Sequence, residues 1–277
     1  MRIVKPRWRV SGPGGLCCSL LIIALSACPA QAADAPAKTD SQRQAATILK
    51  SMAEFLGGLT SFSCTSTNSF ETVQTNGQQI EFGETRRISL SRPGHLRIEE
   101  VASDGTNDLA LFDGKQITVL SADDNVYAQA PQPASLEDAL VYFVRDLHMR
   151  MPLALMLSTH VRTELPALAK EIDYVESTKI KGQTAHHIAG RGDSVDFQIW
   201  VADGSRPLPL RIVITYKLAP AQPRFAADIS DWITNPKFAD KTFSLSLPKD
   251  ARNIPFAVQL ITPGGAPQTA ATGELKP

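Results

Sequence analysis

The most regular alternation of hydrophobic and polar positions in the chain lies in "VDFQIWVADGSRPLPLRIVITYK", residues 195–217. Period-two alternation places one set of side chains on one face of a pleated strand and the other set on the opposite face. The loop "ADGSRPLP" contains Asp-Gly and two prolines, so the pattern predicts two antiparallel strands joined in a hairpin. The apolar positions are Val195, Phe197, Ile199 and Val201 before the loop, and Leu210, Ile212, Ile214 and Tyr216 after it.

A second strand-forming region runs from Ser61 to Pro131 and is rich in Thr, Ser, Val and Ile. The turn sequences "TNGQ", "RPGH" and "FDGK" punctuate it, at the spacing of about eight to twelve residues that is typical of consecutive short strands. Parallel strands would require helices between them, and no helical pattern separates these segments. The region therefore predicts an antiparallel meander of about six strands.

Two regions have helical periodicity instead. Residues 41–59 carry apolar side chains at steps of three and four, which predicts an amphipathic helix with Ser41 as its N-cap. Residues 135–160, "SLEDALVYFVRDLHMRMPLALMLSTH", predict a helix capped by Ser135 with Asp138, and a second short helix after Pro152. Because this second region is so apolar, we expect it to be covered by the rest of the protein.

The order of these elements predicts the fold class. Strands are expected again from Tyr174, with a last long strand from Phe225 to Ile233 and a closing strand or irregular segment in "FADKTFSLSLPKDARNI". Runs of strands kept apart from runs of helices are typical of an α+β fold. We predict a single domain over residues 41–261, a flexible leader over 33–40 and a disordered tail over 262–277.

The N-terminal residues predict export. Four basic residues and no acid occur in the first fifteen positions, and the short apolar run "LCCSLLIIALSA" follows. A membrane-spanning helix needs ~20 apolar residues, so the pattern favours a signal peptide, residues 1–32, cleaved after "AQA". Alternatively, "LSAC" resembles a bacterial lipobox in which Cys28 is acylated and anchors the protein to a membrane. Both alternatives predict a protein outside the cytoplasm, in the periplasm.

Charge and candidate chemistry narrow the function. Removal of residues 1–32 leaves 24 basic and 28 acidic residues, a net charge of −4, which gives no support for nucleic-acid binding. Cys64 is the one cysteine of the predicted mature chain, so an internal disulfide is excluded. His186 and His187 are neighbours on a predicted strand and should point to opposite faces, which prevents joint metal binding. We predict no catalytic residues, no metal site and no cofactor.

The strand and turn motifs carry a resemblance to a known family. The segments "SFSC", "RRISLSRPGHLRIEE", "LFDGKQITVLSADDNVYA", "DFQIWVADGSRPLPLRIVITY" and "FAADISDW" resemble exported bacterial proteins of the DUF2092 type. Their order over about residues 42–247 also resembles the half-barrel of the outer-membrane lipoprotein carrier LolA and its relatives. The resemblance implies a long, curled antiparallel sheet of about ten or eleven strands wrapped over a few helices.

That resemblance implies a function as well, because proteins with this fold hold acyl chains on the concave face of the sheet. We therefore predict a non-enzymatic carrier or sensor that binds a lipid or another hydrophobic ligand. The same apolar residues also fit ordinary packing against the helices, so an interaction module for an envelope protein, with a self-packed core, stays open. An enzyme with a dispersed site is a third alternative. The predicted ligand contacts are Phe197, Ile199, Val201, Leu210, Ile212 and Ile214.

Overall fold

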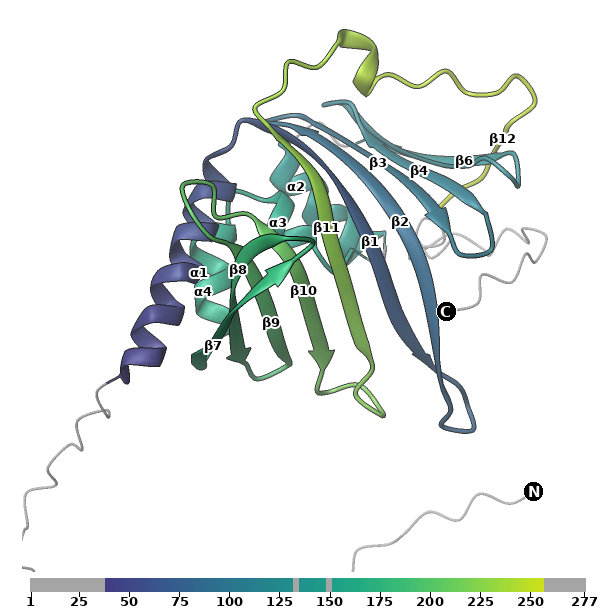
Figure 1. Cartoon of the computed structure of the whole chain (residues 1–277). Coiled ribbons are helices and arrows are strands. Elements are labelled where there is room, and N and C mark those ends of the chain that lie inside the picture. Colours follow the sequence, from purple (N-terminus) through teal and green to yellow (C-terminus); the bar gives the residue numbers. More distant parts are fainter. Residues whose placement is uncertain (1–37, 132–134, 148–150, 257–277) are drawn as a thin grey trace, which may run out of the picture. The chain divides into compact units, whose positions relative to one another are not determined.

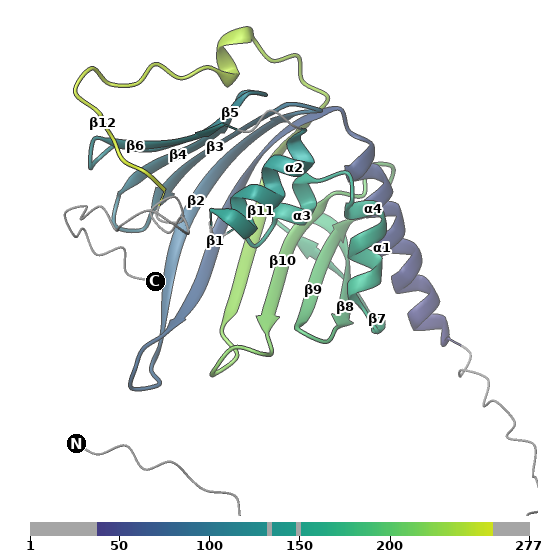
Figure 2. The same cartoon turned by 180° about the vertical axis from the view of Figure 1, so that it is seen from behind.

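The computed structural model describes residues 38–131, 135–147 and 151–256. Its strands form one sheet in the order β12-β6-β5-β4-β3-β2-β1-β11-β10-β9-β8-β7, which curls around a group of helices (Figures 1 and 2). The fold class predicted from the sequence is therefore confirmed. The strands are β1 Ser61–Val73, β2 Gln79–Ser91, β3 His95–Ala102, β4 Asn107–Phe112, β5 Gln116–Ser121, β6 Val126–Pro131, β7 Glu171–Ile180, β8 Gln183–Arg191, β9 Val195–Ala202, β10 Pro209–Tyr216, β11 Arg224–Thr234 and β12 Arg252–Asn253.

The sheet consists of two antiparallel meanders that meet at β1. Strands β1 to β6 pair in chain order, as the sequence predicts, and strands β7 to β11 do the same. Strand β1 pairs with β2 on one side and with β11 on the other, antiparallel in both cases. The predicted closing segment contains the 3₁₀ helix Asp240–Phe243 and the two-residue strand β12, which pairs parallel to β6.

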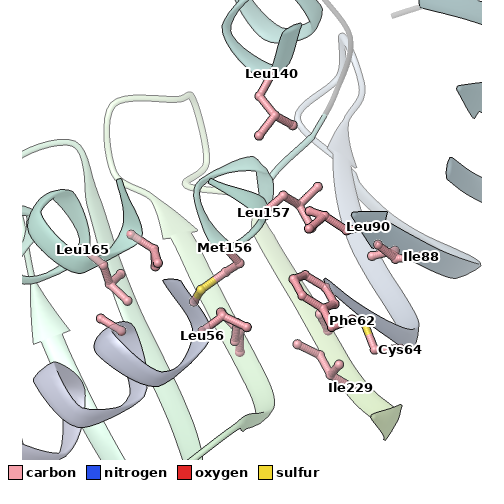
Figure 3. Packing of buried hydrophobic residues seen from close by; sticks show 14 of the residues in the cluster. Leu56, Phe62, Cys64, Ile88, Leu90, Leu140, Met156, Leu157, Leu165 and Ile229 are labelled. Carbon is pink, nitrogen blue, oxygen red and sulfur yellow. The ribbon is translucent and has the colours of Figure 1, made fainter. Parts of the chain in front are cut away.

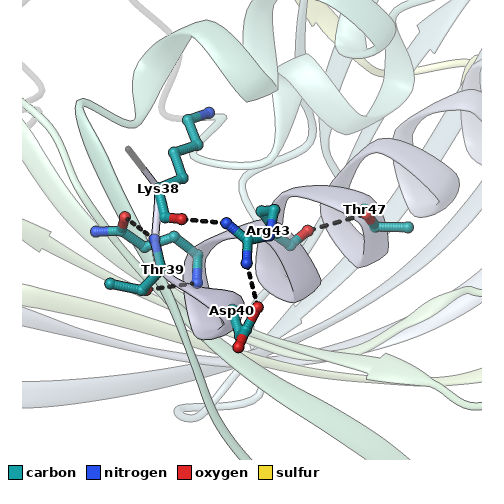
Figure 4. Close-up of polar contacts among 6 residues, drawn as sticks. Lys38, Thr39, Asp40, Arg43 and Thr47 are labelled. Atoms are coloured by element: carbon teal, nitrogen blue, oxygen red, sulfur yellow. Dashed lines mark hydrogen bonds and ion pairs between the residues drawn. The ribbon is translucent and has the colours of Figure 1, made fainter. Parts of the chain in front are cut away.

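Helix α1, Asp40–Gly58, begins at a capping box that differs from the predicted one. The Thr39 hydroxyl accepts a hydrogen bond from the Gln42 backbone N–H at 3.2 Å, and the Gln42 side chain accepts one from the Thr39 backbone N–H at 3.0 Å (Figure 4). The predicted N-cap, Ser41, instead bonds the edge strand β7, where its hydroxyl accepts from the Tyr174 N–H at 3.0 Å. The prediction was wrong because Thr39 with Gln42 provides the reciprocal bonds that satisfy two free N–H groups.

The apolar stripe of α1 packs against the concave face of the sheet. The helix contacts β7, β8 and β9 as well as α4. Its buried stripe belongs to the main hydrophobic core, together with Phe62 and Leu90 of the sheet (Figure 3). The stripe consists of Ala45, Leu49, Met52, Ala53 and Leu56.

The remaining helices lie on the same side of the sheet (Figure 2). Helix α2, Leu136–Val141, starts with the predicted Ser135–Asp138 capping box and continues as a π-helix, Tyr142–Asp146. Two short helices follow, α3 Ala154–Leu157 and α4 Val161–Leu168. No helix was predicted at α4, because only eight residues form it and one of them is a proline.

Several predictions concern residues outside the described part of the chain. These are the signal peptide 1–32, the alternative anchor Cys28, most of the leader 33–40 and the tail 262–277. Within the described ranges, the helices are too short or too polar to cross a membrane.

Leu49→Ala in α1 should lower the free energy of unfolding by about 2–5 kcal/mol, because it leaves a cavity between helix and sheet. Leu49 is 2% exposed. Lys50→Ala is the matched control, since the Lys50 side chain is 70% exposed and its loss should cost less than about 1 kcal/mol. Urea denaturation measures both, and equal destabilisation by the two variants would contradict the packing of α1 on the sheet.

Candidate functional site

Most of the predicted ligand contacts lie in the main core, on the concave face. Phe197, Ile199, Val201 and Ile212 are each at most 5% exposed, and they belong to the same cluster as the buried stripe of α1. Ile214 is partly buried against this cluster. These side chains are therefore covered by the chain's own helices, and their contact with a ligand stays a prediction.

Leu210 lies apart from the other five predicted residues. The pairing of β9 with β10 shifts between Pro209 and Arg211, and Leu210 packs with Ala185, Ala202 and Trp200 in a separate cluster. A bulge adds one residue to a strand and so reverses which side chains face the core. The prediction that Leu210 shares a face with Ile212 was therefore wrong.

One row of apolar side chains crosses the concave face over five neighbouring strands. The pairing registers place its members directly opposite one another on β9, β10, β11, β1 and β2. We call this set the outer row; it consists of Phe197, Ile214, Phe225, Phe70 and Phe82.

The exposed fraction of the side chains rises over the last three members of the outer row, Phe225, Phe70 and Phe82. Phe225 is 2% exposed, whereas Phe82 is 43% exposed, and the rings of Phe70 and Phe82 stack with centroids 5.9 Å apart. The β1–β2 hairpin that carries these two rings extends past the helices (Figures 1 and 2). At the other end, the Phe197 ring fills the space that a side chain at Gly190 would need. The outer row thus connects the helix-covered core to an accessible apolar end.

A band of polar residues interrupts the concave face beside the outer row. Each member lies on the face that also carries core residues such as Ile88 and Ile98 of the same strands. The pairing registers align these polar residues from β1 to β5. We call this set the polar band; it consists of Ser66, Asn68, Glu84, Arg86, Glu100, Asp108 and Ser121.

Hydrogen bonds connect the polar band. Asn68 Nδ2 donates to Glu84 Oε1 at 2.9 Å, and Arg86 Nε lies 2.9 Å from Glu84 Oε1 and 2.8 Å from Glu100 Oε2. The side chains are largely removed from water: Glu84 is 8% exposed, Arg86 14% and Glu100 24%. Buried charges need such partners, because their desolvation is costly.

Burial also changes the acidity of the carboxyl groups in the polar band. It raises the pKa of Glu100, an effect that Arg86 opposes and Glu84 reinforces. The pKa of Asp108 is raised as well, first by burial and then by the negative charge of Glu100, against a hydrogen bond from Ser121. Asp108 Oδ1 is buried and has no hydrogen-bond partner among the described residues. An unpaired buried acceptor of this kind costs free energy.

Sequence reasoning missed the polar band although part of its signal was present. In "FGETRRISL", the residues Phe82, Glu84, Arg86, Ile88 and Leu90 share one face by period-two alternation. Because charged residues usually face water, Glu84 and Arg86 were not expected on the same face as these apolar residues. The alignment of the band across five strands depends on the strand registers, which the sequence does not specify.

Two arginines bond the helices to one another and to the sheet. Arg92, in the β2–β3 turn, donates through Nη1 to the Leu59 carbonyl and through Nη2 to the Leu157 carbonyl at 2.8 Å. Arg162 of α4 donates to the Gly57 carbonyl at 2.6 Å. These three bonds satisfy carbonyls at helix ends, which would otherwise lack partners. They keep α1, α3 and α4 over the concave face.

The two neighbouring histidines point to opposite faces of β8, as predicted. His186 is opposite Val201, a core residue, and bonds Asp203 at 3.1 Å. His187 is opposite Trp200, on which its ring stacks with centroids 4.0 Å apart. In the part of the chain that the structure describes, no three His, Cys, Asp or Glu side chains are grouped to hold a metal ion.

Burial raises the pKa of the Cys64 thiol to about 12, so this cysteine stays protonated at neutral pH.

A curled antiparallel sheet with helices over its concave face defines the protein as an α+β half-barrel. The chain belongs to the DUF2092 family, described as predicted periplasmic proteins, whose model matches residues 45–257. The family membership indicated by the strand and turn motifs is thus confirmed. A comparison with curated proteins gave no match.

Solved structures that resemble this fold have low sequence identity to this chain. The lipoprotein LppX from Mycobacterium tuberculosis is 13% identical, with a TM-score of 0.46 over 72% of this chain and 99% of that one. A LolA superfamily protein from Nitrosomonas europaea is 12% identical, with a TM-score of 0.37 over 73% and 97%. In the MucA/MucB complex from Pseudomonas aeruginosa, the matching chain is 15% identical, with a TM-score of 0.40 over 73% and 61%.

Arg92→Met should loosen the helices over the concave face, because it removes both hydrogen bonds from Arg92. Hydrogen exchange of the amides in residues 153–168 should accelerate about tenfold or more, since a hydrogen bond to a charged group contributes roughly 1.5–3 kcal/mol. Arg87→Met, at a residue of β2 outside the polar band, is the control and should leave these amides unchanged. Identical exchange in both variants would show that Arg92 does not hold the helices.

The stability of Glu100→Gln relative to the wild type should be more favourable at neutral than at acidic pH. The raised pKa means that, just above the ordinary value of 4.5, the unfolded chain has lost a proton that folded Glu100 retains. Wild-type stability therefore falls as the pH rises through this window, whereas Gln does not titrate. Urea denaturation at about pH 4 and about pH 7 tests this. A stability difference between variant and wild type that does not change with pH would contradict it.

Proposed function

We propose that the protein is a non-enzymatic periplasmic protein that binds a lipid or another hydrophobic ligand on the concave face of its sheet, as a carrier or sensor. The observation that carries the proposal is the outer row, which runs from the buried core to the exposed ring of Phe82. An alkyl chain laid along this row would gain ~0.8 kcal/mol for each methylene removed from water. Hydrocarbon binding of this kind needs few polar contacts.

The helices determine how deep a ligand can reach. Phe82 is accessible without any rearrangement, and Ile214 is partly buried. Contact with Ile199, Val201 or Ile212 requires α1 and α4 to move away from the sheet, since these residues are covered by helix side chains. Arg92 and Arg162 oppose that movement. We infer that a ligand first contacts the β1–β2 end of the outer row.

A second candidate function is docking of an envelope protein on a self-packed core. The coverage of Phe197, Ile199, Val201 and Ile212 by the helices favours it. A protein partner would find two exposed apolar side chains on the α2 segment, Val141 at 48% and Val144 at 43%. A stable interface would have to bury well over ~1,000 Å² in total.

The polar band is also the feature that an enzyme would need, because buried carboxyl groups with raised pKa values are suited to acid–base catalysis. Ion-pair networks that serve structure or binding change pKa values in the same way. Glu100 lies 2.8 Å from the guanidinium of Arg86, an arrangement that holds both charges in place. We therefore assign the polar band to binding.

The binding proposal is tested by native mass spectrometry of the protein purified from a bacterial periplasm, with solvent extraction of the same sample. We expect a stoichiometric adduct with an acyl or alkyl chain. The intact mass also separates a mature chain that begins at Ala33 from one acylated at Cys28. A bare mass with no extractable lipid would favour the self-packed alternative.

Phe82→Ser should weaken the binding of a fluorescent alkyl probe about tenfold, because an aromatic side chain contributes roughly 1.5–3 kcal/mol when a ligand covers it. Val101→Ser is the matched control on the neighbouring strand: Val101 is 45% exposed, against 43% for Phe82. Fluorescence titration measures both affinities. Equal affinities for the two variants would exclude the outer row as the contact surface.

A further inference from the structure

The polar band and the outer row are close enough for one molecule to contact both. On β1, Asn68 is two residues from Phe70, and on β2, Glu84 is two residues from Phe82, on the same face in each case. Two residues along a strand span about 6.5 Å. A head group attached to a chain on the outer row would therefore first reach Glu84. The next row, in which Arg86, Glu100 and Asp108 pair across β2, β3 and β4, lies about 6.5 Å further along the strands. This inference rests on the proposed function.

The charge of the polar band is unbalanced. It contains three carboxyl groups, those of Glu84, Glu100 and Asp108, and one guanidinium, that of Arg86. Arg86 lies within 3 Å of both glutamates, and no ion pair between Arg86 and Asp108 is present in the described residues. The polar band thus contains more acidic than basic side chains.

One atom of the band requires a donor. Asp108 Oδ1 is shielded from water and unpaired among the described residues. Buried acceptors are normally hydrogen-bonded, and an exception calls for a specific explanation, such as a functional role or a bound water or ion. A metal ion does not fit, because the described residues contain no group of side chains arranged to hold one. A positively charged organic group with N–H donors would both balance the carboxylate charge and supply the missing hydrogen bond.

We propose that the polar band binds the protonated amine of an amphipathic ligand whose hydrocarbon chain lies along the outer row. An ammonium group offers three N–H donors and one positive charge, which match the free oxygen of Asp108 and the carboxyl surplus around Glu100. The stacked rings of Phe70 and Phe82 provide an apolar surface for the hydrocarbon chain. An anionic head group would meet the carboxyl groups with like charge.

The test uses three probes with the same twelve-carbon chain, dodecylamine, dodecanol and dodecanoate, each below its micelle concentration or solubility limit. Isothermal titration calorimetry at neutral pH measures their affinities for the whole mature protein. We expect dodecylamine to bind about tenfold or more tightly than the other two, since hydrogen bonds to charged groups are the strong ones. Measurable binding of all three probes without preference would overturn the inference and leave the proposed function standing.

The double variant Glu100→Gln and Asp108→Asn should remove the preference for dodecylamine while dodecanol binds as before. Glu99→Gln is the matched control, because Glu99 is the neighbour of Glu100 on β3 and faces away from the polar band, where it pairs with Arg97 at 2.8 Å. Retained binding of dodecanol shows that the double variant is folded. A preference that survives the double variant would overturn the inference, and no binding of any probe to the wild type would overturn the proposed function with it.

Discussion

The pairing of β1 with both β2 and β11 is the constraint on which the rest of the structure depends. It joins the two meanders into one sheet, and its register determines which side chains of five strands share the concave face. Because side chains alternate with a period of two, a slip of one residue would exchange the two faces. Both the outer row and the polar band exist because these registers place their members opposite one another on neighbouring strands.

A bulge in β11 lets this strand pair with β1 along its length while its apolar side chains still face the core. The pairing of β1 with β11 shifts between Ser63 and Thr65, beside Asp231, whose φ is 55°. The extra residue reverses the parity of β11, so Ile229 and Trp232 both face the core although they are three residues apart. Trp232 then packs against Phe62 with ring centroids 5.4 Å apart. An aspartate tolerates this left-handed conformation better than most residues do.

The sequence predicted most helices and strands correctly, but not which side chains the strand registers bring together on one face. Alternation and turn residues identified the β1–β6 meander and the β9–β10 hairpin, because these signals are local. The face of Leu210 and the N-cap of α1 were predicted wrongly, because a bulge and a competing capping box decide them. The polar band was not predicted, since it arises only when Arg86, Glu100 and Asp108 are brought into register on three different strands.

The polar band is costly for a protein that needs only a stable core. A buried ion pair contributes little net stability compared with well-packed apolar residues, and one oxygen of Asp108 has no hydrogen-bond partner within the described ranges. Residues that break local rules in this way are expected at functional sites. The outer row beside the band is, in contrast, a surface suited to hydrocarbon, which makes the concave face amphipathic. This combination is the basis for assigning a ligand with a polar head and an apolar chain.

The central claim is that the ligand lies on the concave face between the outer row and the polar band. Photo-crosslinking with an alkyl chain that carries a diazirine, followed by mass-spectrometric mapping of the adducts, tests it most directly. The account predicts adducts in β1 and β2 near Phe70 and Phe82, and in β10 near Ile214. Adducts confined to the opposite face, for example at Trp200 or Val101, would contradict it.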